Sequence, residues 1–289
     1  METARKRVLS LGFSPCPNDT FIFYALVHGR IKKDGLAFRE VLEDVETLNR
    51  KALRGELDVT KISYHALGHL RENYVALRSG AALGKGCGPL LVARGPLDPG
   101  ALKGGKIAVP GGLTTAYLLL MLFEPSFRNN TVPMVFSDIM PAVRDGRVDA
   151  GLVIHEGRFT YQNYGLHCLM DLGDWWEGRT ELPIPLGGII ARRSLGTKVL
   201  RAVEEAVRES VLYTRSHPEE AASYIKGHAQ EIDTLVINSH IGLYVNDFTV
   251  DIGSEGENAL RVMFEMAGDA GIFEGPGKTA KNKNSLFIA

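Results

Sequence analysis

Short apolar runs alternate with helix-like segments through the first half of the chain, and this order does most to limit the possible folds. Apolar runs of four to eight residues between turn residues are typical of buried strands, and patterns with a 3.6-residue period are typical of helices. Strands that alternate with helices predict an α/β fold with a parallel sheet. The predicted strands are residues 8–13, 36–42, 57–62, 74–77, 106–109, 133–136 and 150–154, and the predicted helices are residues 20–28, 44–53, 63–70, 114–123 and 138–143.

Two further apolar runs, Pro89–Ala93 and Ile184–Ala191, separate two such α/β series. A chain of 289 residues is near the size at which one core splits into two domains. We therefore predict a two-lobed α/β fold with a ligand cleft between the lobes. Lobe one would comprise residues 1–90 plus 190–289, and lobe two residues 91–189. The C-terminal third is predicted to be helical, over residues 199–216, 218–226, 231–245 and 254–270.

The charge balance argues against a partner held by bulk charge. The chain has 33 Lys and Arg against 34 Asp and Glu, a net charge of −1 with neutral histidines. Proteins that bind nucleic acid through its phosphates normally show a basic excess or a basic stripe. The stretch Lys278–Asn284 holds three lysines and is typical of a solvated tail. We predict no nucleic-acid partner.

The N-terminal segment and the cysteines favour a cytoplasmic protein. The apolar stretch after Arg7 is interrupted by Ser14–Asp19 before it reaches the length of a signal peptide or a membrane span. Cys16, Cys87 and Cys168 are odd in number and form no CxxC pair, so they predict no disulfide framework. We predict a cytoplasmic location and no membrane association.

Ligands of open α/β sheets bind outside the carboxyl ends of the strands, so the residues that follow each strand are candidate site residues. The turn Ser14–Asp19 follows the first strand, and Asn18 or Asp19 is predicted to cap the next helix. The turn is either a rigid entry to that helix or a loop that directs Ser14, Cys16 or Asn18 into the cleft. For Cys16, a small apolar turn residue is a more ordinary role than a nucleophile.

Two other strand ends lead into helices. Ser63, after Lys61 and Ile62, is either a plain N-cap or a ligand contact at a helix start that attracts a carboxylate or hydroxyl. The turn Gly111–Thr115 lacks the Lys-Ser/Thr pair of a nucleotide P-loop and the GxGxxG spacing. Its hydroxyls and free N–H groups favour one carboxylate or a polyol over a glycine turn with a simple cap. We predict that Thr114 and Thr115 contact the ligand.

A histidine, His155, ends the strand at residues 150–154, and an imidazole with a pKa near 6.5 suits a general base. Glu156 either orients this ring or faces solvent. A zinc-peptidase HExxH motif is excluded because position 159 is Phe159. His65 and His69 have a spacing compatible with a metal but no third ligand at a recognisable spacing, so no metal is predicted. The pair Trp175 and Trp176 is either an aromatic substrate wall or core.

Four stretches together resemble the family of 1,4-dihydroxy-6-naphthoate synthases of the futalosine route to menaquinone. They are SPCPNDTFIFYALVHG (14–29), DVTKISYHAL (58–67), GGLTTAYLLL (111–120) and DAGLVIHEGRFTYQNYGL (149–166). The resemblance implies a two-lobed, type II periplasmic-binding-protein-like fold used by a cytoplasmic lyase. It implies conversion of cyclic dehypoxanthinyl futalosine, a carboxylated substrate, to 1,4-dihydroxy-6-naphthoate without a cofactor. His155 would be the proton acceptor, and the substrate contacts would be Lys61, Ile62, Ser63, Thr114 and Thr115, with Ser14 and Asn18 as further candidates.

Two alternatives remain at this point. One is chorismate dehydratase of the same pathway, against which the segment IHEGRFTY (154–161) argues. The other is a solute-binding protein without catalysis, which would normally carry a secretion signal. The sequence leaves the oligomeric state open.

Overall fold

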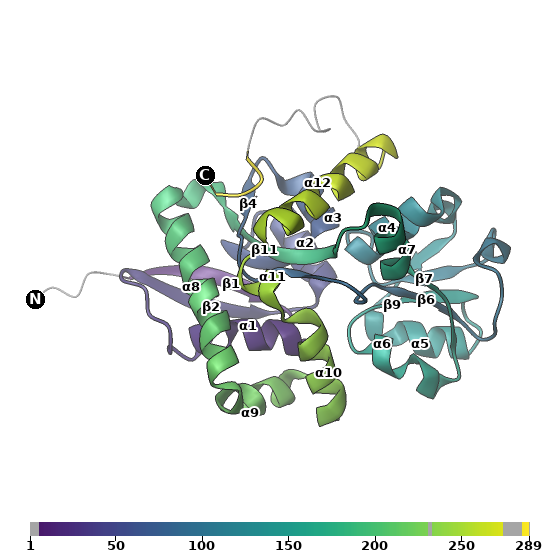
Figure 1. Cartoon of the computed structure of the whole chain (residues 1–289), viewed down its shortest axis with the longest axis horizontal. Coiled ribbons are helices and arrows are strands. Elements are labelled where there is room, and N and C mark those ends of the chain that lie inside the picture. Colours follow the sequence, from purple (N-terminus) through teal and green to yellow (C-terminus); the bar gives the residue numbers. More distant parts are fainter. Residues whose placement is uncertain (1–5, 231–232, 274–284, 289) are drawn as a thin grey trace, which may run out of the picture.

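The fold contains two β-sheets that lie side by side, each covered by helices (Figure 1). It is seen in a computed structural model that describes residues 6–230, 233–273 and 285–288. The first sheet has the order β2-β1-β3-β11-β4, with β5 paired to β11, and the second has the order β10-β6-β9-β7-β8. The strands are β1 (Arg7–Phe13), β2 (Leu36–Leu42), β3 (Val59–Ser63), β4 (Tyr74–Ala76), β5 (Ala82–Gly84), β6 (Leu90–Ala93), β7 (Ile107–Val109), β8 (Thr131–Pro133), β9 (Ala150–Val153), β10 (His167–Asp171) and β11 (Ile184–Arg192). The predicted tail 278–284 lies outside the described residues.

Each sheet is mixed rather than purely parallel. Strand β1 pairs in parallel with β2 and β3, and β7 pairs in parallel with β8 and β9, as predicted. The two apolar runs that were predicted only to separate the α/β series are strands as well, and both are antiparallel to their neighbours: β11 to β3, β4 and β5, and β6 to β9 and β10. A parallel pair needs a crossover that returns the chain to the same end of the sheet. Strand β11 instead enters the first sheet after β10 of the second sheet and the helix that follows β10.

Strand β11 also bears on where the lobes divide. All of Ile184–Arg192 belongs to the first sheet, although the predicted boundary assigned residues up to 189 to lobe two. The pairing therefore favours a return to lobe one about six residues earlier. The division into two discontinuous lobes remains our proposal.

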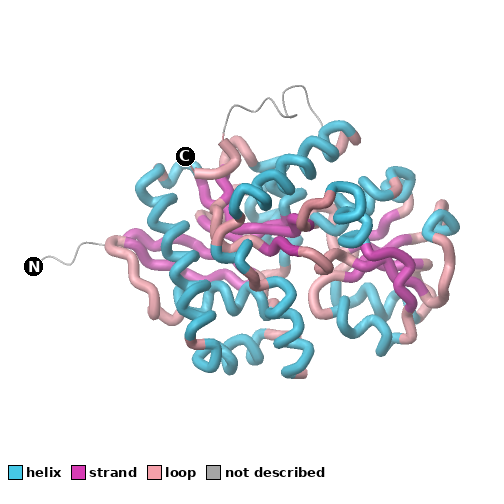
Figure 2. Tube along the Cα trace, in the orientation of Figure 1, coloured by secondary structure: helices cyan, strands magenta, loops and turns pink. Residues whose placement is uncertain are grey.

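Helices lie on both sides of the first sheet (Figure 2). Helix α1 packs against α8, α9 and α10, so most of the helical C-terminal third covers one side of lobe one. The helices are α1 (Pro17–Val27), α2 (Val45–Leu53), α3 (Tyr64–Leu70), α4 (Thr115–Phe123), α5 (Phe136–Arg144), α6 (Gly157–Thr160), α7 (Leu172–Thr180), α8 (Thr197–Ser216), α9 (Pro218–His228), α10 (Thr234–Tyr244), α11 (Asp247–Val250) and α12 (Gly253–Asp269). Short 3₁₀ turns cover Pro99–Leu102, Pro125–Asn129, Tyr161–Tyr164 and Arg193–Leu195.

Most predicted elements occur at the expected places, and the differences have local causes. The predicted strand 133–136 is wrong because Pro133 ends β8 and Phe136 already begins α5. Strands β5 and β10 and helix α7 were not predicted. Residues 231–232, at the start of the predicted helix 231–245, lie outside the described residues. None of the helices in the described part of the chain has both the length and the apolar character of a membrane span.

The start of α1 differs from the prediction in a way that affects the cleft. Asp44 caps α2 by accepting from the backbone N–H groups of Glu46 and Thr47, at 3.0 and 3.1 Å. Asn18 and Asp19, in contrast, do not cap α1, which begins at Pro17, three residues before the predicted start at residue 20, with Cys16 as its N-cap. Proline suits the first helical position because its missing N–H would have no intrahelical partner. The side chains of Asn18 and Asp19 are thereby left for other contacts.

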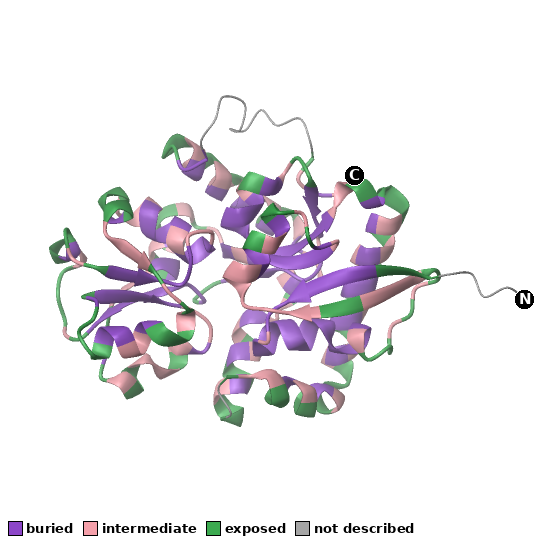
Figure 3. Cartoon of the chain, turned by 180° about the vertical axis from the view of Figure 1, so that it is seen from behind, coloured by how far each residue is buried: buried purple, intermediate pink, exposed green. Residues whose placement is uncertain are grey.

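The hydrophobic core is continuous between the lobes. One cluster joins Ile62 and Leu67 of the first lobe to Ile107 and Leu152 of the second. Helix α4 lies in the middle of this cluster and packs against α3, α12 and β11 on one side and α7 on the other. Figure 3 shows buried strands at the centre of both lobes. The two sheets are therefore joined by packed side chains as well as by the chain crossings.

Candidate active site

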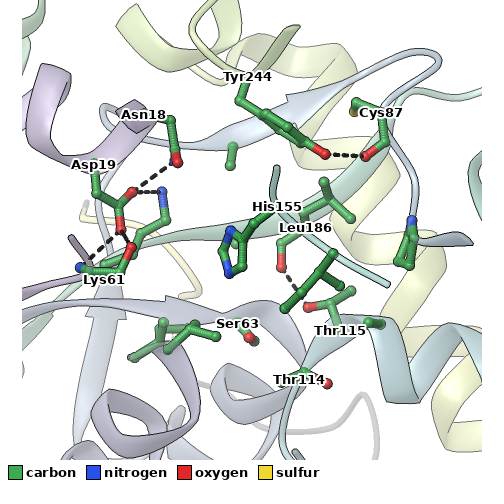
Figure 4. Close-up of a pocket in the computed structure, with 18 of the residues that line it drawn as sticks. Asn18, Asp19, Lys61, Ser63, Cys87, Thr114, Thr115, His155, Leu186 and Tyr244 are labelled. Carbon is green, nitrogen blue, oxygen red and sulfur yellow. Dashed lines mark hydrogen bonds and ion pairs between the residues drawn. The ribbon is translucent and has the colours of Figure 1, made fainter. Parts of the chain in front are cut away.

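A cavity lies at the strand ends between the two lobes, with about 670 Å³ of empty space including its open mouth. Its walls come from the end of β3, the residues after β1 and β9, the start of α4, and helix α10. All eight residues predicted from the sequence line it, namely Ser14, Asn18, Lys61, Ile62, Ser63, Thr114, Thr115 and His155. Figure 4 labels six of them, all except Ser14 and Ile62. Whether they bind substrate stays a prediction.

A buried ion pair forms one side of the cavity. Lys61 Nζ lies 3.0 Å from Asp19 Oδ1, and the two side chains are only 6% and 3% exposed. Asp19 Oδ2 also accepts from the backbone N–H and the hydroxyl of Ser14, at 3.1 and 2.7 Å. The charge of Lys61 and the Ser14 hydroxyl are thus largely satisfied within the protein. Removal of one partner would leave an uncompensated buried charge.

The start of α4 forms the opposite side. Thr114 Oγ1 accepts from Tyr117 N at 3.2 Å and donates to Gly111 O, which makes Thr114 the helix cap. Thr115 Oγ1 donates to Leu186 O and accepts from His65 N. Both hydroxyls are therefore engaged inside the protein. The backbone N–H groups of Thr115 and Ala116 have no acceptor among the described residues, and a helix N-terminus with free N–H groups favours an anion.

Helix α2 supplies two supporting residues that the sequence analysis missed. Glu46 Oε2 accepts from Leu113 N at 3.1 Å and so connects lobe one to the turn before α4. Asn49 Oδ1 accepts from Ser63 N at 2.9 Å, and its amide donates to Ser63 Oγ at 3.3 Å. Ser63 is the N-cap of α3 by position but makes no side-chain cap bond. Residues 46 and 49 are three apart and share one helix face, which is the signal that could have paired them.

His155 lies at the centre of the cavity wall. Its backbone is left-handed, with φ of 53°, which is uncommon for a residue other than glycine. Nδ1 lies 3.4 Å from Cys16 Sγ, and the ring meets Phe136 edge-on at 5.1 Å between centroids. Nε2 has no hydrogen-bond partner in the described part of the chain. Figure 4 shows the imidazole between the Lys61–Asp19 pair and the Thr114–Thr115 turn.

Electrostatics keep the His155 imidazole neutral at neutral pH. Burial lowers the pKa of His155 below its ordinary value of 6.5, and the negative charges of Glu156 and Asp19 offset part of this shift. Burial, with a further contribution from Glu156, raises the pKa of Cys16 well above its ordinary value. The residue beside Nδ1 is therefore a neutral thiol. A neutral imidazole retains one basic nitrogen.

Glu156 is buried, and its Oε1 has no hydrogen-bond partner among the described residues. Among the described residues no hydrogen bond joins Glu156 to His155. Cys16 lies beside Nδ1 of the imidazole instead, where Glu156 was one predicted orienting group. The ligand atoms of Cys16, His155 and Glu156 lie within 4.8 Å of one another, and they are the group in the described residues that could hold a metal ion. The His65–His69 pair is not part of such a group, and His65 Nδ1 lies 3.3 Å from Thr114 O.

The tryptophans do not form a substrate wall. Trp176 is fully buried and donates its indole N–H to Pro183 O at 3.2 Å. Trp175 packs edge-on against Phe123. Neither lines the cavity. Helix α10 instead contributes His240 and Tyr244, which the sequence analysis missed because no motif marks them and they lie far along the chain.

Comparison with known proteins gives consistent matches. Residues 9–269 match a protein family described as menaquinone biosynthesis. A 1,4-dihydroxy-6-naphtoate synthase from Thermus thermophilus is 55% identical over 280 residues, which cover 97% of this chain and 99% of that protein. A second one, from Streptomyces coelicolor, is 49% identical and covers 94% of this chain and 97% of that protein.

The fold has matches among solute-binding proteins. The solved structure of the alkanesulfonate-binding protein SsuA from Xanthomonas axonopodis pv. citri matches with a TM-score of 0.69 at 13% identity. The match covers 94% of this chain and 96% of that one. At this identity the likeness concerns the fold alone. The predicted two-lobed, periplasmic-binding-protein-like fold is confirmed.

Proposed function

The chain belongs to the menaquinone biosynthesis family, as a lyase of the 1,4-dihydroxy-6-naphthoate synthase type, and from this premise we propose that it acts on cyclic dehypoxanthinyl futalosine with His155 as general base. The observation that carries the proposal is the position of His155. Among the residues that the structure describes, its Nε2 has no hydrogen-bond partner, and the ring lies in a cavity opposite backbone N–H groups that have no acceptor there. A base must reach its proton, and a neutral ring can accept one.

The two sides of the cavity suggest how the substrate is oriented. The substrate carboxylate would accept from the N–H groups of Thr115 and Ala116 at the start of α4, with Ser63 nearby. Lys61 would contribute positive potential while it remains paired with Asp19. The carboxylated ring system would then lie across the cavity with its remaining carbons toward His155.

The chemistry assigned to His155 is proton abstraction beside a carbonyl. In the working tautomer the Nδ1–H would face Cys16 Sγ, and the Nε2 lone pair would take the carbon-bound proton. The electron pair of the broken C–H bond would form an enolate. The carbon–carbon bond to the sugar-derived fragment would then break in a retro-aldol sense, in which the oxygen on the ring carbon becomes a carbonyl and the electron pair of the bond leaves with the fragment, which takes the proton back from His155. Buried hydroxyl and N–H donors stabilise the oxyanion. Loss of the fragment makes the second ring aromatic, which drives the reaction.

The alternatives of the sequence analysis lose support. Both matched relatives that cover this chain are 1,4-dihydroxy-6-naphtoate synthases, so chorismate dehydratase and a purely solute-binding role are not favoured. We retain from the sequence a carboxylated substrate and a cytoplasmic location as parts of this proposal.

A turnover assay on the purified protein tests the proposal. Cyclic dehypoxanthinyl futalosine should be converted to 1,4-dihydroxy-6-naphthoate, measured by chromatography with mass detection, whereas chorismate should be left unchanged. Turnover of chorismate, or binding of the futalosine derivative without any product, would contradict the proposed reaction.

A further inference from the structure

A second histidine, His240 on α10, also lines the cavity. Its ring is 1% exposed and lies nearly parallel to that of His155, with 6.3 Å between ring centroids. It also packs against the ring of Tyr244 at 4.6 Å. Its Nδ1 is buried and has no hydrogen-bond partner among the described residues. Such an atom is costly unless a ligand satisfies it.

The protonation of this ring follows from its neighbours. The Asp19 carboxylate is paired with Lys61 and can only accept, so the Asn18 Nδ2 that lies 2.9 Å from Asp19 Oδ1 is the donor there. The amide oxygen of Asn18 must then face His240, where it lies 2.9 Å from Nε2. An oxygen accepts, so Nε2 carries the hydrogen. The series of contacts from Lys61 through Asp19 to Asn18 thereby fixes the tautomer of His240.

The other nitrogen of His240 is consequently a hydrogen-bond acceptor. Burial lowers the pKa of His240 well below 6.5, and the positive charge of Lys61 lowers it further, so the ring stays neutral. A neutral Nδ1 offers one lone pair and no proton. It can bind a hydroxyl group but repels a carboxylate oxygen.

We propose that His240 Nδ1 accepts a hydrogen bond from a hydroxyl of the sugar-derived part of the substrate and so positions that part beside His155. This role rests on the proposed function. The cavity would then have a donor side at the start of α4 for the carboxylate and an acceptor side at His240 for the hydroxyl. A substrate with these two groups at opposite ends can bind in only one orientation.

Two substitutions of His240 test the acceptor at Nδ1 separately from the contact between Nε2 and Asn18. The amide of Gln can reach the position of Nε2, so His240→Gln keeps a donor toward Asn18 but removes the acceptor at Nδ1. The amide of Asn reaches the position of Nδ1, so His240→Asn keeps an acceptor there but loses the bond to Asn18. We expect kcat/KM for the substrate to fall on the order of tenfold in His240→Gln and by clearly less in His240→Asn. Affinity for 1,4-dihydroxy-6-naphthoate, which lacks the sugar-derived part, should stay unchanged in both.

Wild-type turnover in His240→Gln would overturn the proposal, and so would equal losses in both folded variants. If either variant fails to fold, ¹⁵N spectra of histidine-labelled His155→Asn protein serve instead. Addition of the substrate should move the His240 Nδ1 resonance in the direction of a hydrogen-bonded acceptor, and an unmoved resonance contradicts the role. Wild-type enzyme without any turnover contradicts the proposed function itself, whereas intact turnover with no difference between the variants contradicts only the role of His240.

Discussion

At the scale of single residues, His155 combines an uncommon backbone conformation with the proposed role of general base. Its φ of 53° is tolerated by Asn far better than by Ala, because a short polar side chain can hydrogen-bond locally in the left-handed region. His155→Asn therefore removes the titratable nitrogen with little change to the backbone. We expect turnover to fall by about 10²–10⁴-fold, the range typical of a general base.

His155→Ala should lose turnover to the same extent and, in addition, up to about 1 kcal/mol of stability relative to His155→Asn. Rates of product formation and urea unfolding measure the two effects separately. Wild-type turnover in the Asn variant would mean that the base lies elsewhere, with Glu156 or Cys16 the next residues to replace.

The pH dependence of kcat/KM should depend on the charge of Glu156, the residue next to His155. Burial lowers the pKa of His155, and Glu156 raises it in part, so the free enzyme should lose activity only as pH falls below 6.5. Glu156→Gln removes that opposing charge, and the acid limb of the profile should move to lower pH. Glu265→Gln, at an exposed position of α12, serves as the control and should leave the limb in place. An acid limb that moves to higher pH in Glu156→Gln would contradict the assignment.

The residues of the site differ in how far the sequence could predict them. Those at or just after the end of a strand, such as Ser63 and His155, were predictable because strand ends in α/β folds converge on one place. Glu46, Asn49 and His240 lie inside helices, where a polar residue normally indicates a solvent-exposed face, and their partners are distant in sequence. The Cys16–His155 contact joins residues of different lobes and leaves no sequence pattern.

At the scale of elements, the turn into α4 depends on a glycine. Gly111 has φ of +144°, and a Cβ at this position would lie 2.5 Å from the Glu46 carboxylate that accepts from Leu113 N. Gly111→Ala should therefore cost about 1–3 kcal/mol of stability through backbone strain and should raise KM by displacing the helix start. Gly112→Ala is the matched control, because nothing lies within 4 Å of its Cβ position.

Denaturant unfolding and substrate titration measure both effects of the Gly111 substitution. Equal stability of the two alanine variants would show that the contact between Glu46 and this turn does not constrain the loop.

The elements that the sequence predicted well are those with a clear period and a clear stop. Helix α2 has Asp44 as a cap, and α8 has an apolar stripe over Thr197–Ser216. Helix α7 has no such stripe, and its glycines 173 and 178 are typical of a loop. The direction of β11 was not predictable, because an apolar run carries no information on whether the chain enters a sheet from one end or the other.

At the scale of the whole molecule, the shared core determines how the two lobes respond to denaturant. Helix α4 packs against elements of both lobes, and the cluster around it includes Leu119, which is fully buried. Lobes joined in this way should unfold together, in contrast to domains linked only by polar contacts. The two tryptophans of the chain are Trp175 and Trp176, both on α7 of lobe two. Helices α8–α12, in contrast, all belong to lobe one.

Fluorescence and far-UV circular dichroism therefore report on different lobes. We expect one urea transition with the same midpoint for both probes. Leu119→Ala should lower the free energy of unfolding by about 2–5 kcal/mol and move both midpoints together, because the cavity it leaves lies in the shared cluster. Leu235→Ala removes an exposed leucine of α10 and should leave both midpoints nearly unchanged. Two separated transitions in the wild type, or a shift confined to one probe in Leu119→Ala, would show that the lobes are independent folding units whose contact through α4 contributes little to stability.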